Sequence, residues 1–114
     1  MQIRIESIEG TSISRIVLTG RLDIAGTQEV DLKFAANTAA QRKSVIIDMT
    51  AVDFIASIGV RLLITNAKAL SAHKAKMVLL NPQELVAGVL KTSGVDTIIP
   101  IAPDLETALK IISG

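Results

Sequence analysis

The order of apolar and polar residues indicates a sheet at the beginning of the chain. Gln2–Glu6 alternates between polar and apolar side chains, as a strand does when one of its faces meets solvent. Ser14–Leu18 is predicted as a second strand, and Glu9-Gly10-Thr11 between the two supplies turn residues. Gly20–Gly26 is predicted as a connection.

Helical and strand-like segments alternate further along. Thr27–Ala40 is predicted as a helix, although two of its faces carry apolar residues and the pattern does not decide which one packs inward. Val45–Met49 is nearly all apolar, which suits a central strand covered on both faces. We expect Asp53 and Phe54 in the following loop and a second helix over Ile58–Ala72.

The C-terminal part continues the alternation. Lys76–Leu80 is predicted as a buried strand, and Asn81-Pro82-Gln83-Glu84 as a helix start in which the asparagine caps and the proline takes the first helical position. That helix should end near Gly94. Thr97–Ile101 is predicted as a short strand, and Asp104 as the cap of a last helix.

These elements predict an α/β protein whose mixed sheet has about five strands packed against about four helices. The 114 residues fit one compact domain, and we predict a single domain over residues 1–114. Of these residues 49% are apolar, but only two are aromatic, both phenylalanine. The core must therefore be built from aliphatic side chains.

Composition excludes several classes of function. The chain has no cysteine, which excludes disulfides, zinc-thiolate sites and thiol catalysis. Its 12 basic and 11 acidic residues are dispersed, so nucleic-acid binding is not expected. The apolar runs are far shorter than the roughly 20 residues that span a bilayer, and the first residues do not resemble a signal peptide. We expect a cytoplasmic protein without direct membrane insertion.

The sequence offers little catalytic chemistry. His73, the one histidine, is expected in a solvated loop, and no second histidine stands near it to form a metal site. Glycine-rich phosphate loops are absent. We therefore predict a non-enzymatic protein with no catalytic residue, no metal and no cofactor. A small enzyme assembled from distant residues is the open alternative.

One segment combines a strand end, a loop and a helix start. It reads Asp48-Met49-Thr50-Ala51-Val52-Asp53-Phe54-Ile55-Ala56-Ser57-Ile58-Gly59-Val60-Arg61-Leu62-Leu63. This resembles the signature of STAS domains in bacterial anti-sigma-factor antagonists, where a hydrophobic-aromatic pair precedes Asp-Ser-Ser/Thr-Gly-Leu-Gly at a helix start. Thr19-Gly20-Arg21-Leu22-Asp23 resembles a second stretch of that family, and the order of elements fits along essentially the whole chain.

The resemblance implies that Ser57 is a phosphorylation site, because it matches the serine that is phosphorylated in the family. Three other residues match the family's pattern: Asp48, Phe54 and Gly59. Two positions depart from it. The family's Asp before the serine is Ala56 here, and its Ser or Thr after the serine is Ile58. The alanine removes a negative charge beside the site.

These residues also have structural interpretations. Ser57 is predicted at the N-cap of the second helix, where a hydroxyl stabilises the helix by ~1 kcal/mol. Gly59 either is tolerated in the first turn or lets a partner approach closely. Asp23 either orients the next helix or, on the family's pattern, contacts the kinase. Asp48 is expected as a buried structural acid that binds loop N–H groups.

A docking surface is predicted on the second helix beside Ser57. We expect an inward stripe of Val60, Leu63, Ala67 and Leu70. The outer face then carries Arg61, Thr65 and Lys68, with Ile58 and Leu62 at its margin. Such a mixed surface is common in interfaces, and ordinary solvated helix residues are the alternative. The predicted partner-binding residues are Asp23, Ile58, Gly59, Arg61, Leu62 and Thr65.

The resemblance implies a cycle of partner exchange. The unphosphorylated form binds an anti-sigma factor that is also a serine kinase, and this frees the sigma factor. The kinase then phosphorylates Ser57 and is released, and a serine phosphatase restores the first state. The alternative is a soluble STAS subunit of a lipid-transport ABC complex, which Ala56 in place of the acid keeps open.

Overall fold

A five-stranded sheet forms the centre of the molecule. The computed structural model describes all residues from Met1 to Gly114, and the strands lie in the order β1-β2-β3-β4-β5. β1 pairs antiparallel with β2, and every other pairing is parallel. The strands are β1 (Gln2–Ser7), β2 (Ser14–Leu22), β3 (Val45–Ile55), β4 (Met77–Leu80) and β5 (Ile101–Ala102). The predicted mixed sheet is confirmed.

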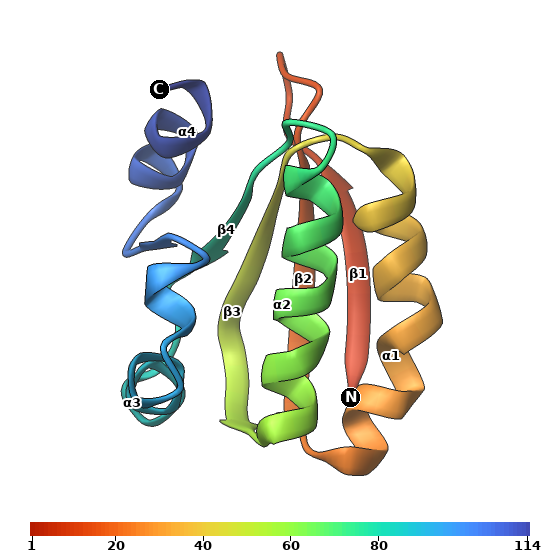
Figure 1. The fold of residues 1–114 in the computed structure, drawn as a ribbon, viewed down its shortest axis with the longest axis vertical. Helices are drawn as coiled ribbons and strands as arrows, with labels where there is room; N and C mark the ends of the chain where they lie inside the picture. The colour runs from red at the N-terminus through yellow and green to blue at the C-terminus, as the bar shows by residue number, and fades with distance from the viewer.

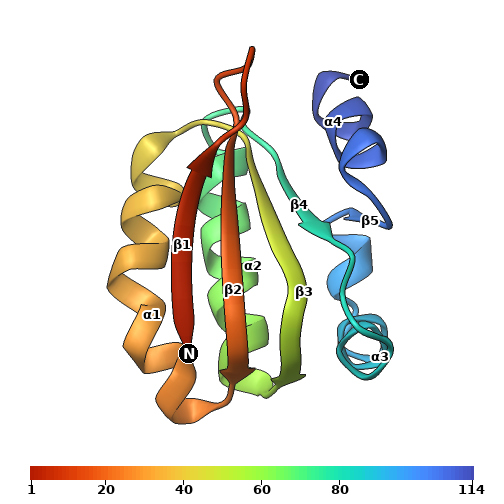
Figure 2. The ribbon, with the colours of Figure 1, turned by 180° about the vertical axis from the view of Figure 1, so that it is seen from behind.

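Four α-helices surround this sheet unevenly. They are α1 (Ile24–Asn37), α2 (Ser57–Ser71), α3 (Glu84–Thr92) and α4 (Leu105–Ser113), with short 3-10 turns η1 (Ala39–Gln41) and η2 (Val95–Thr97). α1 and α2 lie side by side on one face of β1, β2 and β3 (Figure 1). Figure 2 shows those strands from the other face, with no helix in front of them. None of the helices has the length and apolar character needed to cross a membrane.

The hydrophobic core has one part on each face of the sheet. Alternate residues of β3 such as Val45 and Ile47 join α1, α2 and α3 in a cluster of 21 buried residues. The intervening Ile46 faces the opposite way and packs with Val78 and with Ala108 of α4. The apolar first half of β3 is therefore covered on both faces, as its composition predicted. Removal of this aliphatic surface from water is the main term that favours the fold.

Two strands extend further than the sequence predicts. β2 runs to Leu22 and β3 to Ile55, beyond the expected ends at residues 18 and 49. Asp53 and Phe54, which were expected in a loop, therefore lie in β3. The parallel pairing continues through two register shifts, and Gly20 beside these shifts has a φ of 114° that glycine adopts without strain.

The first helix also begins earlier than predicted. Asp23 is the N-cap of α1, and its carboxylate accepts the N–H of Gly26 at 2.8 Å, so the helix starts at Ile24 instead of Thr27. Most of the predicted connection over residues 20–26 is thus regular structure. The structure also decides which face of α1 packs inward, because Leu32 is 87% exposed. The buried residues are Gly26, Thr27, Val30 and Phe34.

The predicted start of the third helix is wrong. Asn81 has a left-handed φ of 49° and directs its side-chain N–H to the Thr50 hydroxyl at 3.4 Å. Gln83 is the N-cap of α3 and donates from its side chain to the Thr50 carbonyl at 2.8 Å. The helix therefore begins at Glu84, because the side chains of Asn81 and Gln83 bind Thr50 of β3 and neither makes a capping hydrogen bond.

The last strand is also displaced from its predicted place. Thr97–Ile101 was expected as a strand, but the chain turns at Gly94, which has a φ of 77°, into η2 and reaches β5 only at Ile101. The N-cap role of Asp104 is confirmed, because its carboxylate accepts the N–H of Thr107 at 2.8 Å.

Candidate functional site

Ser57 lies where β3 ends and α2 begins, at the same end of the sheet as the start of α1 (Figure 1). It is the first residue of α2, and the N-cap is Ala56, so the predicted N-cap position of Ser57 is wrong by one residue. The reason is that the Ala56 N–H donates to the Leu22 carbonyl at 2.9 Å and fixes the chain reversal there. No side chain caps α2, and the exposed serine is not needed for capping.

Gly59 holds the start of α2 against the sheet. A Cβ atom at this position would lie 2.9 Å from Ile55 Cγ1, from Leu22 Cβ and from the Leu22 carbonyl oxygen. The glycine is buried, and the place of its missing side chain is filled by β2 and β3. Neither interpretation made from the sequence describes this, because the residues that approach Gly59 closely belong to the chain itself. Gly59 thereby sets the position of Ser57 relative to the strand ends.

Asp23 and Arg21 form a polar cluster at the end of β2. Asp23 caps α1, and Arg21 lies 3.5 Å from its carboxylate. The hydrogen bond from the Gly26 N–H, followed by Arg21, lowers the pKa of the Asp23 carboxyl below its usual value. The Arg21 guanidinium also lies 4.2 Å from the ring centre of Phe54 on β3. This stacking is not predictable from the sequence, because only the register of β2 against β3 brings the two residues together.

A shallow groove runs between α1 and α2 beside Ser57. It encloses about 220 Å³. From α2 it is lined by Ile58, Arg61, Leu62, Thr65 and Asn66. From α1 it is lined by Thr27, Gln28 and Asp31. The structure therefore brings four predicted partner-binding residues (58, 61, 62 and 65) onto one surface. Asp23 lies nearby at the start of α1, and Gly59 faces inward.

The outer face of α2 agrees with its prediction except at one residue. Arg61, Thr65 and Lys68 are exposed as expected. Leu62, predicted at the margin, is only 6% exposed because α1 packs beside it. Of the predicted inward stripe, Val60, Leu63 and Leu70 are buried and Ala67 is half-buried.

Two polar residues in this groove are buried, which the sequence did not predict. Asn66 is 4% exposed, forms a hydrogen bond of 2.9 Å with the Thr38 hydroxyl and donates to the Leu62 carbonyl at 2.9 Å. Thr27 is 3% exposed, and its hydroxyl has no hydrogen-bond partner. Helical spacing in α1 and α2 could have suggested that these residues lie on facing surfaces, but only the packing of the helices buries them.

Asp48 has the structural role that the sequence favoured. It is 5% exposed, accepts the Thr50 N–H at 3.0 Å and forms an ion pair with Arg15 at 2.6 Å. Burial raises the pKa of its carboxyl, but the hydrogen bonds from Thr50 and Arg15 outweigh burial and hold that pKa below its usual value. The sequence predicted that loop N–H groups bind Asp48, but the Thr50 N–H that does so belongs to β3. Asp48 faces the same side of the sheet as Ile46, away from α1 and α2.

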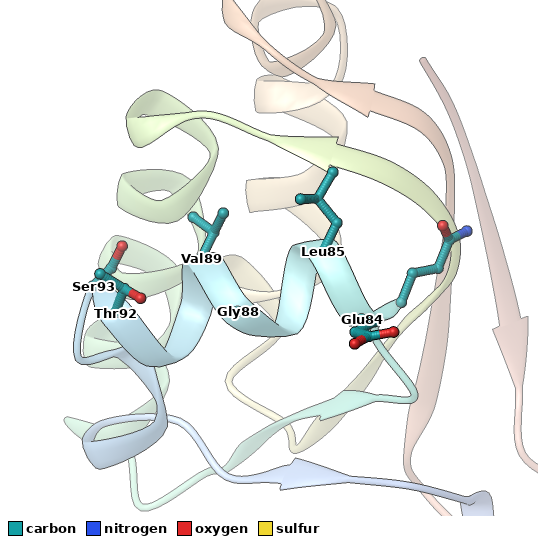
Figure 3. Close-up of a pocket in the computed structure, with 7 residues that line it drawn as sticks. Glu84, Leu85, Gly88, Val89, Thr92 and Ser93 are labelled. Carbon is teal, nitrogen blue, oxygen red and sulfur yellow. The ribbon is translucent and has the colours of Figure 1, made fainter.

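A larger hollow lies along α3. It encloses about 820 Å³ and is lined by Gln83, Glu84, Leu85, Gly88, Val89, Thr92 and Ser93. In Figure 3 Leu85 and Val89 project from the same side of the helix. The lining contains neither a nucleophile–base pair nor a set of metal ligands. No group of three or more His, Cys, Asp or Glu residues in the structure could hold a metal ion, and His73 is exposed.

The sequence and the structure both match known proteins. A family model described as the STAS domain matches residues 2–108. BtrV of Bordetella bronchiseptica, provisionally named an anti-sigma factor antagonist, is 28% identical over 108 residues, which cover 95% of this chain and 91% of BtrV.

The similar solved structures share the fold at low sequence identity. The crystal structure of tm1081 from Thermotoga maritima, also provisionally named an anti-sigma factor antagonist, has a TM-score of 0.87 at 16% identity and covers 98% of this chain and 95% of tm1081. The anti-sigma factor antagonist SpoIIAA has a TM-score of 0.73 at 21% identity in its unphosphorylated form, with 99% of both chains covered. Phosphorylated SpoIIAA from Bacillus has a TM-score of 0.70 at 22% identity and covers 96% of this chain and 99% of SpoIIAA.

Proposed function

The chain belongs to the STAS domain family, and on this premise we propose that it is an anti-sigma factor antagonist whose binding is controlled by phosphorylation of Ser57. The observation that carries the proposal is the placement of Ser57. Ser57 is the exposed first residue of α2, its hydroxyl is not used for capping, and it directly precedes Ile58, which lines the groove between α1 and α2. The names of BtrV and SpoIIAA support the assignment.

The start of α2 can accept a phosphate without a change of fold. The first N–H groups of a helix have no acceptor within the helix, and Ala56 offers no side chain to bind them. Phosphate oxygens are favourable acceptors there, since the helix dipole also attracts negative charge. Phosphorylation adds about two negative charges to this surface. In this proposal the domain supplies the substrate serine and no catalytic group.

The partner is an anti-sigma factor that binds the unphosphorylated surface formed by Asp23, Ile58, Arg61, Leu62 and Thr65. Ile58 and Leu62 provide the apolar wall of the groove and Arg61 a positive charge, and Asp23 adds a negative charge at the N-cap of α1. Gly59 acts indirectly, by holding Ser57 at the strand ends. The anti-sigma factor is also the kinase of Ser57 in this proposal, and a serine phosphatase reverses the modification.

The experiment that tests this function measures partner binding with charge variants. Wild type, Ser57→Ala and Ser57→Asp are used to capture the partners from a cell extract, and the purified partner is then titrated calorimetrically. Ser57→Ala should bind like wild type and resist phosphorylation, whereas Ser57→Asp should bind weakly. Ser12→Asp is the matched control, because Ser12 is exposed in the β1–β2 turn and the charge change is the same.

Three results would contradict the proposal. If Ser57→Asp binds the anti-sigma factor as tightly as Ser12→Asp does, Ser57 does not control binding. If the captured partners are instead a permease and an ATPase, the chain is a subunit of an ABC transport complex. Full phosphorylation of Ser57→Ala by the kinase would show that the modified residue is a different one.

A further inference from the structure

Arg61 is a cation without a carboxylate partner. It is exposed on α2, lines the groove and takes part in none of the five ion pairs of the structure. Among the charged residues around it, Asp31 lies across the groove on α1. Asp23 and Arg21 at the end of β2 pair with each other, and Asp53 is exposed on β3. The guanidinium of Arg61 is therefore available.

The spacing of Ser57 and Arg61 places them on the same face of α2. Residues four apart in a helix have Cβ atoms about 5–6 Å from each other. Helical side chains lean toward the N-terminus, so Arg61 leans toward Ser57. An anion that precedes a cation by four residues is the more favourable of the two orders. Arginine also binds phosphate through two parallel hydrogen bonds.

We propose that the phosphate on Ser57 binds the guanidinium of Arg61 within α2 and thereby removes a positive charge from the groove between α1 and α2. The inference rests on the proposed function, because it takes Ser57 as the phosphorylated residue. Phosphorylation then acts twice: it adds negative charge, and it withdraws the one cation that a carboxylate of the partner would meet at this groove. A carboxylate at position 57 reproduces only part of this effect.

Arg21, the other arginine near this end of the sheet, is a poorer phosphate ligand. Its guanidinium already lies over the Phe54 ring and beside the Asp23 carboxylate, and these contacts would be lost if it moved. Ala56 favours the pairing with Arg61, because the residue beside Ser57 has no carboxylate that competes for the guanidinium.

The test is a phosphorus NMR titration of the full chain, with phosphoserine installed at position 57 during synthesis so that no kinase is needed. The second ionisation of phosphoserine has a pKa of about 6. At low salt we expect this pKa to be lower in wild type than in Arg61→Gln, by about 0.3 pH unit or more. Arg61→Lys should keep most of the effect, and 1 M salt should reduce it.

Two matched variants serve as controls. Lys68→Gln removes an exposed cation from the same helix and should leave the phosphate pKa unchanged, and so should Arg21→Gln. Equal phosphate pKa values in wild type and Arg61→Gln would overturn the inference. A shift caused by Arg21→Gln and not by Arg61→Gln would overturn it as well. Melting curves check that each variant is folded.

Partner binding separates this inference from the proposed function. If phosphoserine at position 57 blocks the partner while Arg61→Gln leaves the phosphate pKa unchanged, the function stands and the intrahelical pair is wrong. If Arg61→Gln shifts the phosphate pKa while the partner binds phosphorylated and unphosphorylated chains equally, the pair exists and the proposed function is wrong. If both hold, Arg61→Gln should also reduce the fold-difference in affinity between the two phosphorylation states.

Discussion

Replacement of Gly59 by alanine tests the packing that positions Ser57. The added methyl carbon would lie 2.9 Å from three atoms, Ile55 Cγ1, Leu22 Cβ and the Leu22 carbonyl oxygen. Two of these atoms belong to the backbone of β2 or are attached directly to it, so they cannot rotate away. The Leu22 carbonyl also accepts the Ala56 N–H at 2.9 Å, and its displacement would strain the bond that fixes the start of α2.

The size of the effect follows from two opposing contributions. Overpacking of a fixed site costs about 1–3 kcal/mol. Alanine is favoured over glycine inside a helix by up to ~1 kcal/mol, and less in the first turn. We therefore expect Gly59→Ala to lower the free energy of unfolding by about 1–2 kcal/mol. For a chain of this length each kcal/mol changes the melting temperature by about 4 °C, so the loss corresponds to roughly 4–8 °C.

Gly88→Ala is the matched control. It is the same substitution in α3, where an added methyl group meets nothing within 4 Å. Only the helix preference then acts, and the melting temperature should rise by about 4 °C. Thermal and urea denaturation of both variants measure the difference. If Gly59→Ala melts at or above the temperature of wild type, the start of α2 is not held at the distance described, and the argument that Gly59 positions Ser57 is wrong.

Three further predictions follow from single contacts. Ser57→Asp and Ile58→Glu should each weaken binding of the proposed anti-sigma factor partner, by about 100-fold or ~2.8 kcal/mol for Ser57→Asp, while melting stays cooperative and near wild type. Calorimetry that finds normal affinity would contradict this. The pKa of the Asp48 carboxyl is lowered, because the hydrogen bonds it accepts outweigh its burial. The ionised carboxylate therefore stabilises the fold fully above the unfolded-state pKa of 3.8, and this stabilisation is lost as pH falls through the folded-state pKa. Carbon-detected NMR should give a midpoint below 3.8, and the stability of wild type should approach that of Asp48→Asn over that range. Thr27→Val removes a buried hydroxyl without a partner and should leave stability unchanged or raise it by up to ~1 kcal/mol; a clear loss in urea denaturation would reveal a missing partner.

The parts of the fold that depend on local pattern could be predicted from the sequence. The apolar run of β3 indicated a strand buried on both faces, and it is one. Asp104 indicated a helix cap, and it accepts the N–H of Thr107. The resemblance to STAS domains was confirmed by the family match over residues 2–108. In each case residues close in sequence carry the signal.

The features that the sequence did not predict depend on contacts between distant segments. Ser57 is a better N-cap than Ala56 by residue type, but the Leu22 carbonyl binds the Ala56 N–H and decides the position. The stacking of Arg21 on Phe54 requires the register between β2 and β3, which shifts twice before it reaches them. Local sequence preference indicates which residues surround such a site. It does not identify the distant residue whose contact fixes the position of each.

The sheet order has a consequence for how the protein forms. Each strand pairs with the strand that precedes or follows it in the chain, so the spatial order β1-β2-β3-β4-β5 repeats the order of synthesis. No strand has to wait for a distant later segment before it can pair. The three parallel pairings nevertheless join residues far apart in the chain, such as Ser14 with Val45, and long-range pairing of this kind is slow to form. The β1–β2 hairpin, whose strands are joined by a short turn, can therefore form first, and each later pairing needs one more connecting helix to be in place.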